Sequence, residues 1–311
     1  MLRNNKLMSV FGALALSLGL ATSASAQEAT AFTRFKAGDK ENTGALQIAQ
    51  ATYKNPNTGV EIILYGVVHI ADKAYYKAVQ KDLDSYDVVL WEGVKPGKKK
   101  VKPDESMAGI GEMQKMMCEM LGLTFQKDGI SYKGDNLVWA DMDMDQLQEA
   151  FGGDASKGLG GMMNPGMMKQ LGPLLKMGKP LLKFLFKSNP AMRSRMKMQF
   201  AQQLAGAGNG GEMPGMDKKF QEVILIKRNE VVMKFLKKQL KTTKKGSIAI
   251  FYGAAHMPDF EKRLAKLGYT KVSKEWKSAW AIGGGAAEGE ATPAPAPKAQ
   301  PRPKTGKKRW F

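Results

Sequence analysis

The chain contains only two histidines, His69 and His256, and both close the same short pattern, Gly-x-x-His. The pattern begins at Gly66 and at Gly253, and each copy follows directly after a strongly apolar segment. Glycine lets the chain turn sharply and lets other backbone approach closely. Each imidazole is therefore expected just beyond the end of a buried strand, where the two rings can take part in one site.

Two acidic residues occupy comparable positions. Glu92 follows the apolar segment Asp87–Trp91, and Asp141 follows Asn136–Ala140. Open α/β sheets bind ligands at the carboxyl ends of their parallel strands, so these carboxylates are expected to converge with the imidazoles. Two histidines and one carboxylate are a common ligand set for a divalent metal, here Mn, Co or Zn. Such a metal acidifies bound water or polarises a carbonyl group.

Each of these residues also has a structural interpretation. A single histidine is more often structural than a ligand, and a glutamate after a strand often caps a helix or forms an ion pair. Asp141, or else Asp143 or Asp145, can cap the helix that runs through Leu147. We therefore take His69, Glu92 and His256 as candidate metal ligands, with Asp141, Gly66 and Gly253 as supporting residues.

The elements that must position these residues follow from the apolar runs. The predicted strands are Gln47–Tyr53, Gly59–Val68, Asp87–Trp91, Asn136–Ala140 and Ser247–Tyr252, with one or two more in Tyr269–Ile282. Asp72 is predicted to cap a helix that ends near Leu83. Strands separated by one helix imply a right-handed parallel crossover. The sequence therefore predicts an α/β fold with a central mixed, mostly parallel sheet flanked by helices.

The segment Lys218–Lys241 is predicted to be a helix with one apolar stripe. The stripe consists of Phe220, Ile224, Val231 and Phe235. Arg228 lies inside this stripe, and a buried guanidinium must be paired. Its expected partner is Glu92, an aspartate of the group at Asp141, or a substrate oxygen. An ordinary structural ion pair is an equally good interpretation.

The first 26 residues have the composition of a signal peptide. Arg3 and Lys6 precede the apolar run Leu7–Ala21, and Ala24–Ala26 is a small-residue cleavage pattern that leaves Gln27 as the new N-terminus. The run is shorter than the roughly 20 residues of a membrane-spanning helix. An uncleaved anchor is the alternative. We expect export to the periplasm or the extracellular space.

Three further regions are distinguished by composition. Residues 27–282 are predicted to form the α/β domain, and residues 151–216, rich in Gly, Met, Pro and Lys, a helical insertion within it. Residues 283–311 are predicted to be a disordered, basic tail rich in Pro and Ala. The basic amphipathic segment Leu174–Lys187 within the insertion indicates either an anionic membrane surface as partner or a lid over the site.

Composition excludes several classes of protein. Cys118 is the only cysteine, which rules out an intramolecular disulfide framework and a cysteine-based zinc finger. The net charge is +19, and loss of the two leader cations leaves +17. This charge is compatible with nonspecific nucleic-acid binding, but the sequence contains no recognised nucleic-acid motif, so no specific nucleic-acid partner is expected.

Four spaced elements resemble the TraB/Tiki family, which also takes in the PrgY and GumN groups. They are the segment Tyr65–His69, Glu92 after its strand, the pair Arg228 and Asn229 on a helix, and the segment Gly253–Met257. The resemblance spans roughly residues 47–282 and leaves the Met-rich central region poorly matched.

The resemblance implies both an architecture and a chemistry. The architecture is an α/β fold related to erythromycin esterase and ChaN-like proteins, and Tiki members are described as metal-dependent proteases. Carried over, His69 and His256 are metal ligands, Glu92 is a ligand or general base, and Arg228 is an oxyanion or substrate clamp. Lys227 departs from the family pattern, in which an acidic residue often precedes the arginine, so the pairing of the arginine is open.

The expected function is an exported metal-dependent hydrolase, such as a peptidase, that acts on a peptide or another carbonyl substrate. Two alternatives use the same edge of the sheet. One is a noncatalytic protein that binds a ligand, iron or haem, as in ChaN-like proteins. The other is a membrane-associated peptide-binding protein, as the resemblance to PrgY implies.

Overall fold

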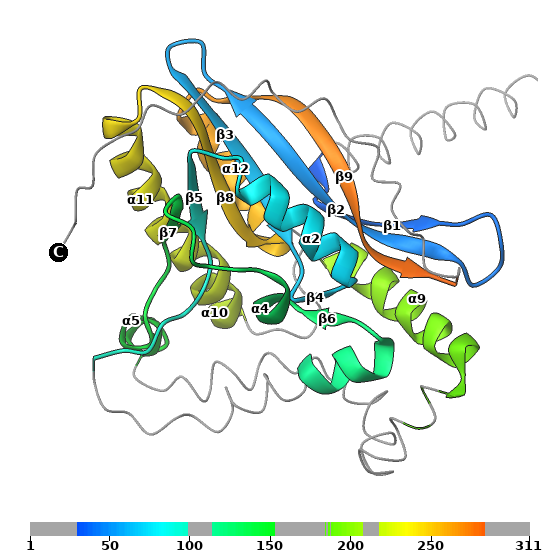
Figure 1. Ribbon diagram of the computed structural model, residues 1–311. Coiled ribbons are helices and arrows are strands. Elements are labelled where there is room, and N and C mark those ends of the chain that lie inside the picture. Colours follow the sequence, from blue (N-terminus) through cyan, green and yellow to red (C-terminus); the bar gives the residue numbers. More distant parts are fainter. Residues whose placement is uncertain are drawn as a thin grey trace, which may run out of the picture.

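The computed structural model describes residues 30–98, 114–152, 184, 186, 188–207 and 218–283. These residues form a central β-sheet with helices on both faces (Figure 1). The predicted leader, the tail after residue 283 and most of the predicted insertion lie outside the described residues. Of the basic amphipathic segment Leu174–Lys187, only Phe184 and Phe186 are described.

The sheet has seven strands in the order β1-β2-β3-β8-β5-β7, and β9 pairs with β2. The strands are β1 (Thr33–Ala37), β2 (Gly44–Lys54), β3 (Gly59–Val67), β5 (Val88–Trp91), β7 (Leu137–Trp139), β8 (Lys245–Gly253) and β9 (Thr270–Ile282). The pairs β3–β8, β8–β5 and β5–β7 are parallel, whereas β2 pairs antiparallel with β1, β3 and β9. The predicted α/β class and mixed sheet are confirmed, and the sheet has a mostly parallel core with an antiparallel edge.

Alternating side chains along the strands build one core on each face of the sheet. On β3, Ile63 and Tyr65 belong to one core, whereas Ile62 and Leu64 belong to the other. This alternation follows from the two-residue period of a strand. Because both faces are covered, the central strands are apolar almost without interruption, which explains why they were recognisable in the sequence.

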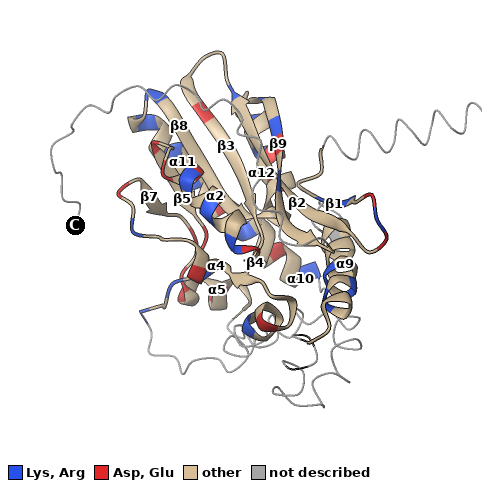
Figure 2. Cartoon of the chain, turned by 45° about the vertical axis from the view of Figure 1, so that its right-hand side comes forward, with Lys and Arg blue, Asp and Glu red and all other residues tan. Residues whose placement is uncertain are grey.

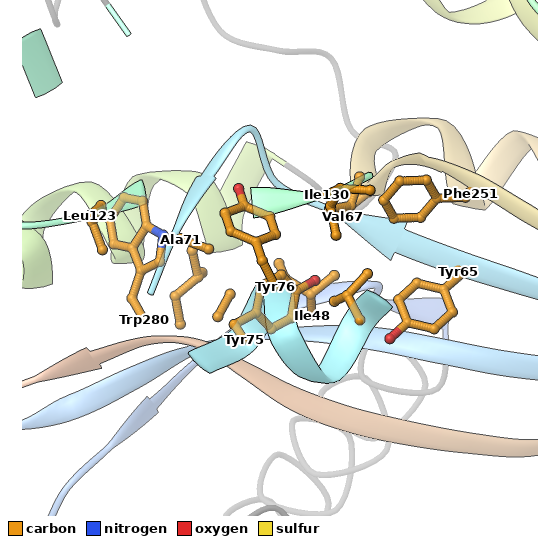
Figure 3. Packing of buried hydrophobic residues seen from close by; sticks show 14 of the residues in the cluster. Ile48, Tyr65, Val67, Ala71, Tyr75, Tyr76, Leu123, Ile130, Phe251 and Trp280 are labelled. Carbon is orange, nitrogen blue, oxygen red and sulfur yellow. The ribbon is translucent and has the colours of Figure 1, made fainter. Parts of the chain in front are cut away.

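Helices α2 (Lys73–Leu83) and α9 (Pro190–Ala207) cover the first core. Tyr75 and Tyr76 of α2 pack with Trp280 of β9 and Phe251 of β8 (Figure 3). The second core lies under α11 (Arg228–Thr242) and α12 (Met257–Lys266), which contribute Val232, Phe260 and other apolar residues. The molecule is therefore a three-layer α/β/α arrangement.

Helix α9 falls inside the segment predicted to be an insertion, but it packs on the main sheet. Phe200 and Ala201 are buried in the first core. Lys197 is only 8% exposed, and its Nζ lies 3.2 Å from Asp72 Oδ1 and 3.2 Å from the carbonyl oxygen of Ala281. This part of the chain thus belongs to the layer that covers the sheet.

Asp72 precedes α2 as predicted, but its carboxylate makes no capping hydrogen bond to the helix. It accepts hydrogen bonds from Lys197 and from the backbone N–H of Ala281 at 2.6 Å. The expected capping role is therefore wrong, because the buried ammonium of α9 and the end of β9 are stronger donors that reach the same carboxylate.

We predict that Asp72→Asn lowers the free energy of unfolding by about 3 kcal/mol, because it leaves the buried Lys197 ammonium without its counter-charge. Asp39→Asn, at an exposed position, is the matched control and should change stability by less than about 0.5 kcal/mol. Urea unfolding followed by circular dichroism measures both. Equal unfolding midpoints for the two variants would show that the Asp72 ion pair is not a stabilising contact.

Candidate functional site

The carboxyl ends of the four parallel strands lie side by side. In the register, Val67 pairs with Gly253, and Trp91 pairs with both Phe251 and Trp139. The segments that leave these strands carry the predicted site residues, which are His69 after β3, Glu92 after β5, Asp141 after β7 and His256 after β8. Residues far apart in the sequence are thus brought to one edge of the sheet.

Glu92 is nearly buried, with its side chain 10% exposed, and both carboxylate oxygens are hydrogen-bonded. Arg228 Nη2 donates to Oε1 at 2.7 Å, and the backbone N–H of Gly253 donates to Oε2 at 2.6 Å. Burial alone would raise the pKa of this carboxyl. The Arg228 guanidinium, followed by His256, His69 and the Gly253 N–H, outweighs burial and lowers the pKa to about 2. Glu92 is therefore ionised at every working pH.

Arg228 joins Glu92 to a second buried carboxylate. Its Nε donates to Asp141 Oδ1 at 2.9 Å, and its Nη2 also donates to Asp141 Oδ2 at 2.6 Å. Burial would lower the pKa of the guanidinium, but Glu92 and Asp141 raise it, so Arg228 is a permanent cation. Since Nε and Nη2 are engaged by the protein, the arrangement favours Arg228 as a positioning residue for Glu92 over a clamp on substrate.

Asp141 itself is 1% exposed. Besides Arg228 it accepts the backbone N–H groups of Gly93 at 2.8 Å and Met142 at 2.7 Å. The next helix, α5 (Met144–Ala150), is capped by Asp143, whose carboxylate accepts from the N–H of Gln146. Of the alternatives open from the sequence, Asp143 is the cap and Asp141 is the partner of the arginine.

The segment predicted to be one regular helix is interrupted just before Arg228. It consists of α10 (Lys218–Gln221), a π-helical turn (Glu222–Lys227) and α11. A π turn accommodates one more residue than an α turn and often lies at functional sites. Arg228 and Asn229 are both buried as a result, although they are consecutive, and each reaches a different group of the site.

His256 is buried in a 3₁₀ turn (Ala254–His256) between β8 and α12. Its Nδ1 lies 2.7 Å from Asn229 Oδ1. Asn229 Nδ2 donates to Asp259 Oδ2 at 2.8 Å and to the His256 carbonyl oxygen at 3.2 Å, which fixes the orientation of the amide. His256 Nδ1 must therefore carry the proton, and Nε2, 3.7 Å from Glu92 Oε1, keeps its lone pair.

The charge state of His256 agrees with this assignment. Burial is the largest effect and lowers its pKa, the Glu92 carboxylate raises it, and Arg228 and His69 lower it again, to a result of about 4. The imidazole is thus neutral near pH 7, as a metal ligand must be.

His69 has the same hydrogen-bonding arrangement, with an amide oxygen at Nδ1. It is exposed, and its Nδ1 lies 3.0 Å from Gln126 Oε1 at the start of α4 (Gln126–Gly129). Gln126 Nε2 donates to the Tyr132 hydroxyl at 2.9 Å, so the amide presents its oxygen to His69. Short antiparallel strands β4 (Ile70–Ala71) and β6 (Thr124–Phe125) hold the two segments together. In both histidines, an amide oxygen fixes the proton on Nδ1 and leaves Nε2 open.

The two predicted glycines have steric roles at this edge. A Cβ on Gly66 would lie 3.0 Å from the carbonyl oxygen of Ala49, and a Cβ on Gly253 would lie 3.3 Å from Glu92 Oε2. Both are closer than ordinary van der Waals contact. Glycine at 253 thus allows its N–H to approach the carboxylate.

Metal ligation was the sharpest expectation from the sequence. Within the described ranges, no three His, Cys, Asp or Glu side chains are grouped closely enough to hold an ion. His256 Nε2 and Glu92 Oε1 are the pair that approaches. His69 is near enough for its charge to lower the pKa of Glu92. A metal at this edge would have to be held by the imidazole Nε2 atoms and a Glu92 oxygen, a donor set whose chemistry would suit Mn, Co or Zn.

Several residues of the site were not recognised in the sequence. Gln126, Tyr132 and Asp259 orient the groups around the histidines, yet none belongs to a motif. Asp259 could have been found from its position three residues after His256, on the first turn of the following helix. Gln126 and Tyr132 carry no such signal, because they reach His69 only through the fold.

Comparison with family models, curated proteins and solved structures found no match for this chain. Among the residues that the structure describes, none of the helices has the length and apolar character needed to cross a membrane.

We predict that the protein loses stability as the pH falls from about 6.5 to 4. The folded chain binds fewer protons than the unfolded chain in this window, because the pKa of His256 is lowered from 6.5 to about 4. The contribution of His256 to the free energy of unfolding is complete above pH 6.5 and is lost as the pH falls through 4. This contribution is about 3 kcal/mol at most. Glu92, with its lowered pKa, contributes in a lower window, between its ordinary 4.5 and about 2.

Urea unfolding at a series of pH values measures this slope. His256→Gln should remove the loss between pH 6.5 and 4, whereas His69→Gln, at an exposed position, should keep it. An unchanged slope in His256→Gln would rule out a buried, neutral His256.

Proposed function

We propose that this protein is a metal-dependent hydrolase that acts on a peptide or another carbonyl substrate, with His69, Glu92 and His256 as the metal ligands. The observation that carries this proposal is the matched state of the two imidazoles. Each gives its Nδ1 proton to a fixed amide oxygen, from Gln126 or Asn229, and each keeps Nε2 open. Metal-binding histidines have this second hydrogen bond almost without exception.

A divalent ion bound to these ligands would supply an acidified water and a positive charge beside the substrate carbonyl. The chain itself provides the remaining functions. Arg228 and the Gly253 N–H hold the two oxygens of Glu92 in one orientation. The buried His256 excludes bulk water from one side, and the exposed His69 lies on the side from which substrate can approach.

The charge state of Glu92 separates its two candidate roles. A carboxylate with a pKa of about 2 is a good ligand for a cation but a weak proton acceptor at neutral pH. The proposed role is therefore that of a ligand that also stabilises positive charge. The general-base role implied by family resemblance is the less favoured of the two.

The same observation favours a second candidate function, which is noncatalytic binding of a ligand, iron or haem, or of a peptide at a membrane. A site whose carboxylate does not take up protons, and whose arginine is already paired, can bind without turning over. Export to the periplasm or extracellular space and contact with an anionic membrane are parts of the proposal that rest on the sequence.

We predict that the purified protein binds one divalent ion and hydrolyses members of a peptide library, and that Glu92→Gln lowers kcat/KM by about 100-fold or more. Gln has the same size, and Arg228 keeps Asp141, so the fold should survive. Glu275→Gln, at an exposed carboxylate, is the control. The metal content of each variant is measured together with the cleavage assay. Bound metal without cleavage would select the noncatalytic alternative, and absence of both would contradict the proposed function.

The side-chain amides of Gln126 and Asn229 are expected to influence metal binding through the two histidines. Gln126→Leu and Asn229→Leu are each predicted to weaken metal affinity by about 10- to 100-fold while leaving all three ligands in place. Gln50→Leu removes an amide that donates a hydrogen bond to the Tyr86 hydroxyl, away from both histidines, and it serves as control. Competition with a metal-binding dye measures the affinities. Equal affinities for Gln126→Leu and the wild type would show that the fixed proton on His69 has no part in binding.

A further inference from the structure

A concave region lies at the end of the sheet opposite to the candidate site. It is a hollow of about 520 Å³ between the β2–β3 turn, the end of α11 and the connection from α12 to β9. Strand β3 runs nine residues from this end to the edge that carries His69. At about 3.3 Å per residue, the two places are roughly 25–30 Å apart. The hollow is therefore independent of the proposed hydrolytic site.

Hydrogen bonds between separate segments hold the walls of this hollow in place. Asn55 Oδ1 accepts the N–H of Asn57 at 2.9 Å within the turn, and Asn55 Nδ2 donates to the carbonyl oxygen of Leu267 at 2.9 Å. The hydroxyls of Thr58 and Tyr269 lie 3.2 Å apart across the same junction. The β2–β3 turn and the connection from α12 to β9 are thus fixed relative to each other before any ligand is present.

The lining combines cations with an apolar floor. Lys237, Lys241 and Lys244 line the hollow, and all three are exposed. No ion pair involves any of them in the part of the chain that the structure describes. Val60 and Leu240 contribute apolar surface beneath them. Figure 2 shows Lys and Arg positions in blue along α11 and at the start of β8.

Carboxylates at this end of the sheet are engaged elsewhere. Glu61 pairs with Lys54 at 2.7 Å, and Asp87 Oδ2 accepts from the N–H of Ser247 at 2.8 Å. Cations in the last turn of a helix also interact favourably with the helix dipole. That effect accounts for lysines near the end of α11, but it does not account for a preformed hollow with a pair of hydroxyls and an apolar floor.

We propose that this hollow binds a phosphate-type oxyanion attached to an apolar body. The three ammonium groups would surround the anion, since a concave surface of one charge sign concentrates counter-ions. The Tyr269 and Thr58 hydroxyls would supply directed hydrogen bonds, and Val60 and Leu240 would contact the apolar part. The same chemistry is found in an anionic lipid headgroup and in a soluble phosphate ester.

The test uses the full chain with two probes, inorganic phosphate followed by calorimetry and vesicles of phosphatidylcholine with or without phosphatidylglycerol followed by co-sedimentation. The triple variant Lys237→Ala, Lys241→Ala, Lys244→Ala should bind the preferred probe about 100-fold more weakly. Each lysine is expected to contribute about 1 kcal/mol to binding, and every 1.4 kcal/mol changes the affinity roughly tenfold. The control triple Lys73→Ala, Lys77→Ala, Lys81→Ala removes the same charge from exposed positions of α2.

Two further variants separate a built site from general attraction by a cationic protein. Tyr269→Phe keeps every charge and should weaken binding about tenfold through loss of a hydrogen bond to a charged group. The single variant Lys244→Ala provides the same test if the triple variant does not fold, because Lys244 lies outside α11. Binding of phosphate in solution would identify a soluble ligand, and binding only to vesicles with phosphatidylglycerol a lipid headgroup. Equal losses in the two triple variants, unchanged affinity in Tyr269→Phe, or no binding of either probe would overturn the proposal.

Discussion

Two buried carboxylates can share one end of this sheet because a single guanidinium lies between them. Removing an ionised carboxylate from water costs several kcal/mol unless donors replace the water. Arg228 supplies three of those hydrogen bonds, two to Asp141 and one to Glu92, and backbone N–H groups supply the others. The orientation of Glu92, and with it the separation from His256, depends on this one side chain.

Two irregular features of the backbone, the π turn before α11 and the glycine at position 253, are explained by the need to place that guanidinium and its partners. The π turn before α11 allows Arg228 and Asn229 to face the site together, so that one residue reaches the carboxylates and the next reaches His256. The glycine at 253 lets backbone come within hydrogen-bonding distance of Glu92. A regular helix and a strand end with a side chain would each displace one of these groups.

Local sequence was sufficient for the central strands and for the residues that follow them, whereas the edge strand β1 and the short strands β4 and β6 were not predicted. The segments at Val60, Val88 and Ile248 are apolar on both faces, and a chain that leaves such a strand must place its next residues at the edge of the sheet. Long-range pairing had no such signal. The position of β8 between β3 and β5, the pairing of β9 with β2, and the packing of α9 on the sheet depend on contacts between distant segments. Gln126 and Tyr132 were missed for the same reason, since an amide and a phenol acquire their roles only from what the fold places beside them.

The charges of the site give a physical reason for a cation there. With Glu92 and Asp141 ionised and Arg228 protonated, the buried group carries a net charge of −1, and the lowered pKa of His256 prevents the imidazole from neutralising it near pH 7. Asp259 does not change this sum, because Arg263 pairs with it. An uncompensated buried charge is unfavourable, and proteins reduce that cost by pairing or by binding metal. The open Nε2 lone pair of His256 points to the same answer, since a neutral imidazole is a ligand for a metal ion and not for an anion. The guanidinium of Arg228 is already paired with both carboxylates, so it is not free to attract an anionic substrate directly.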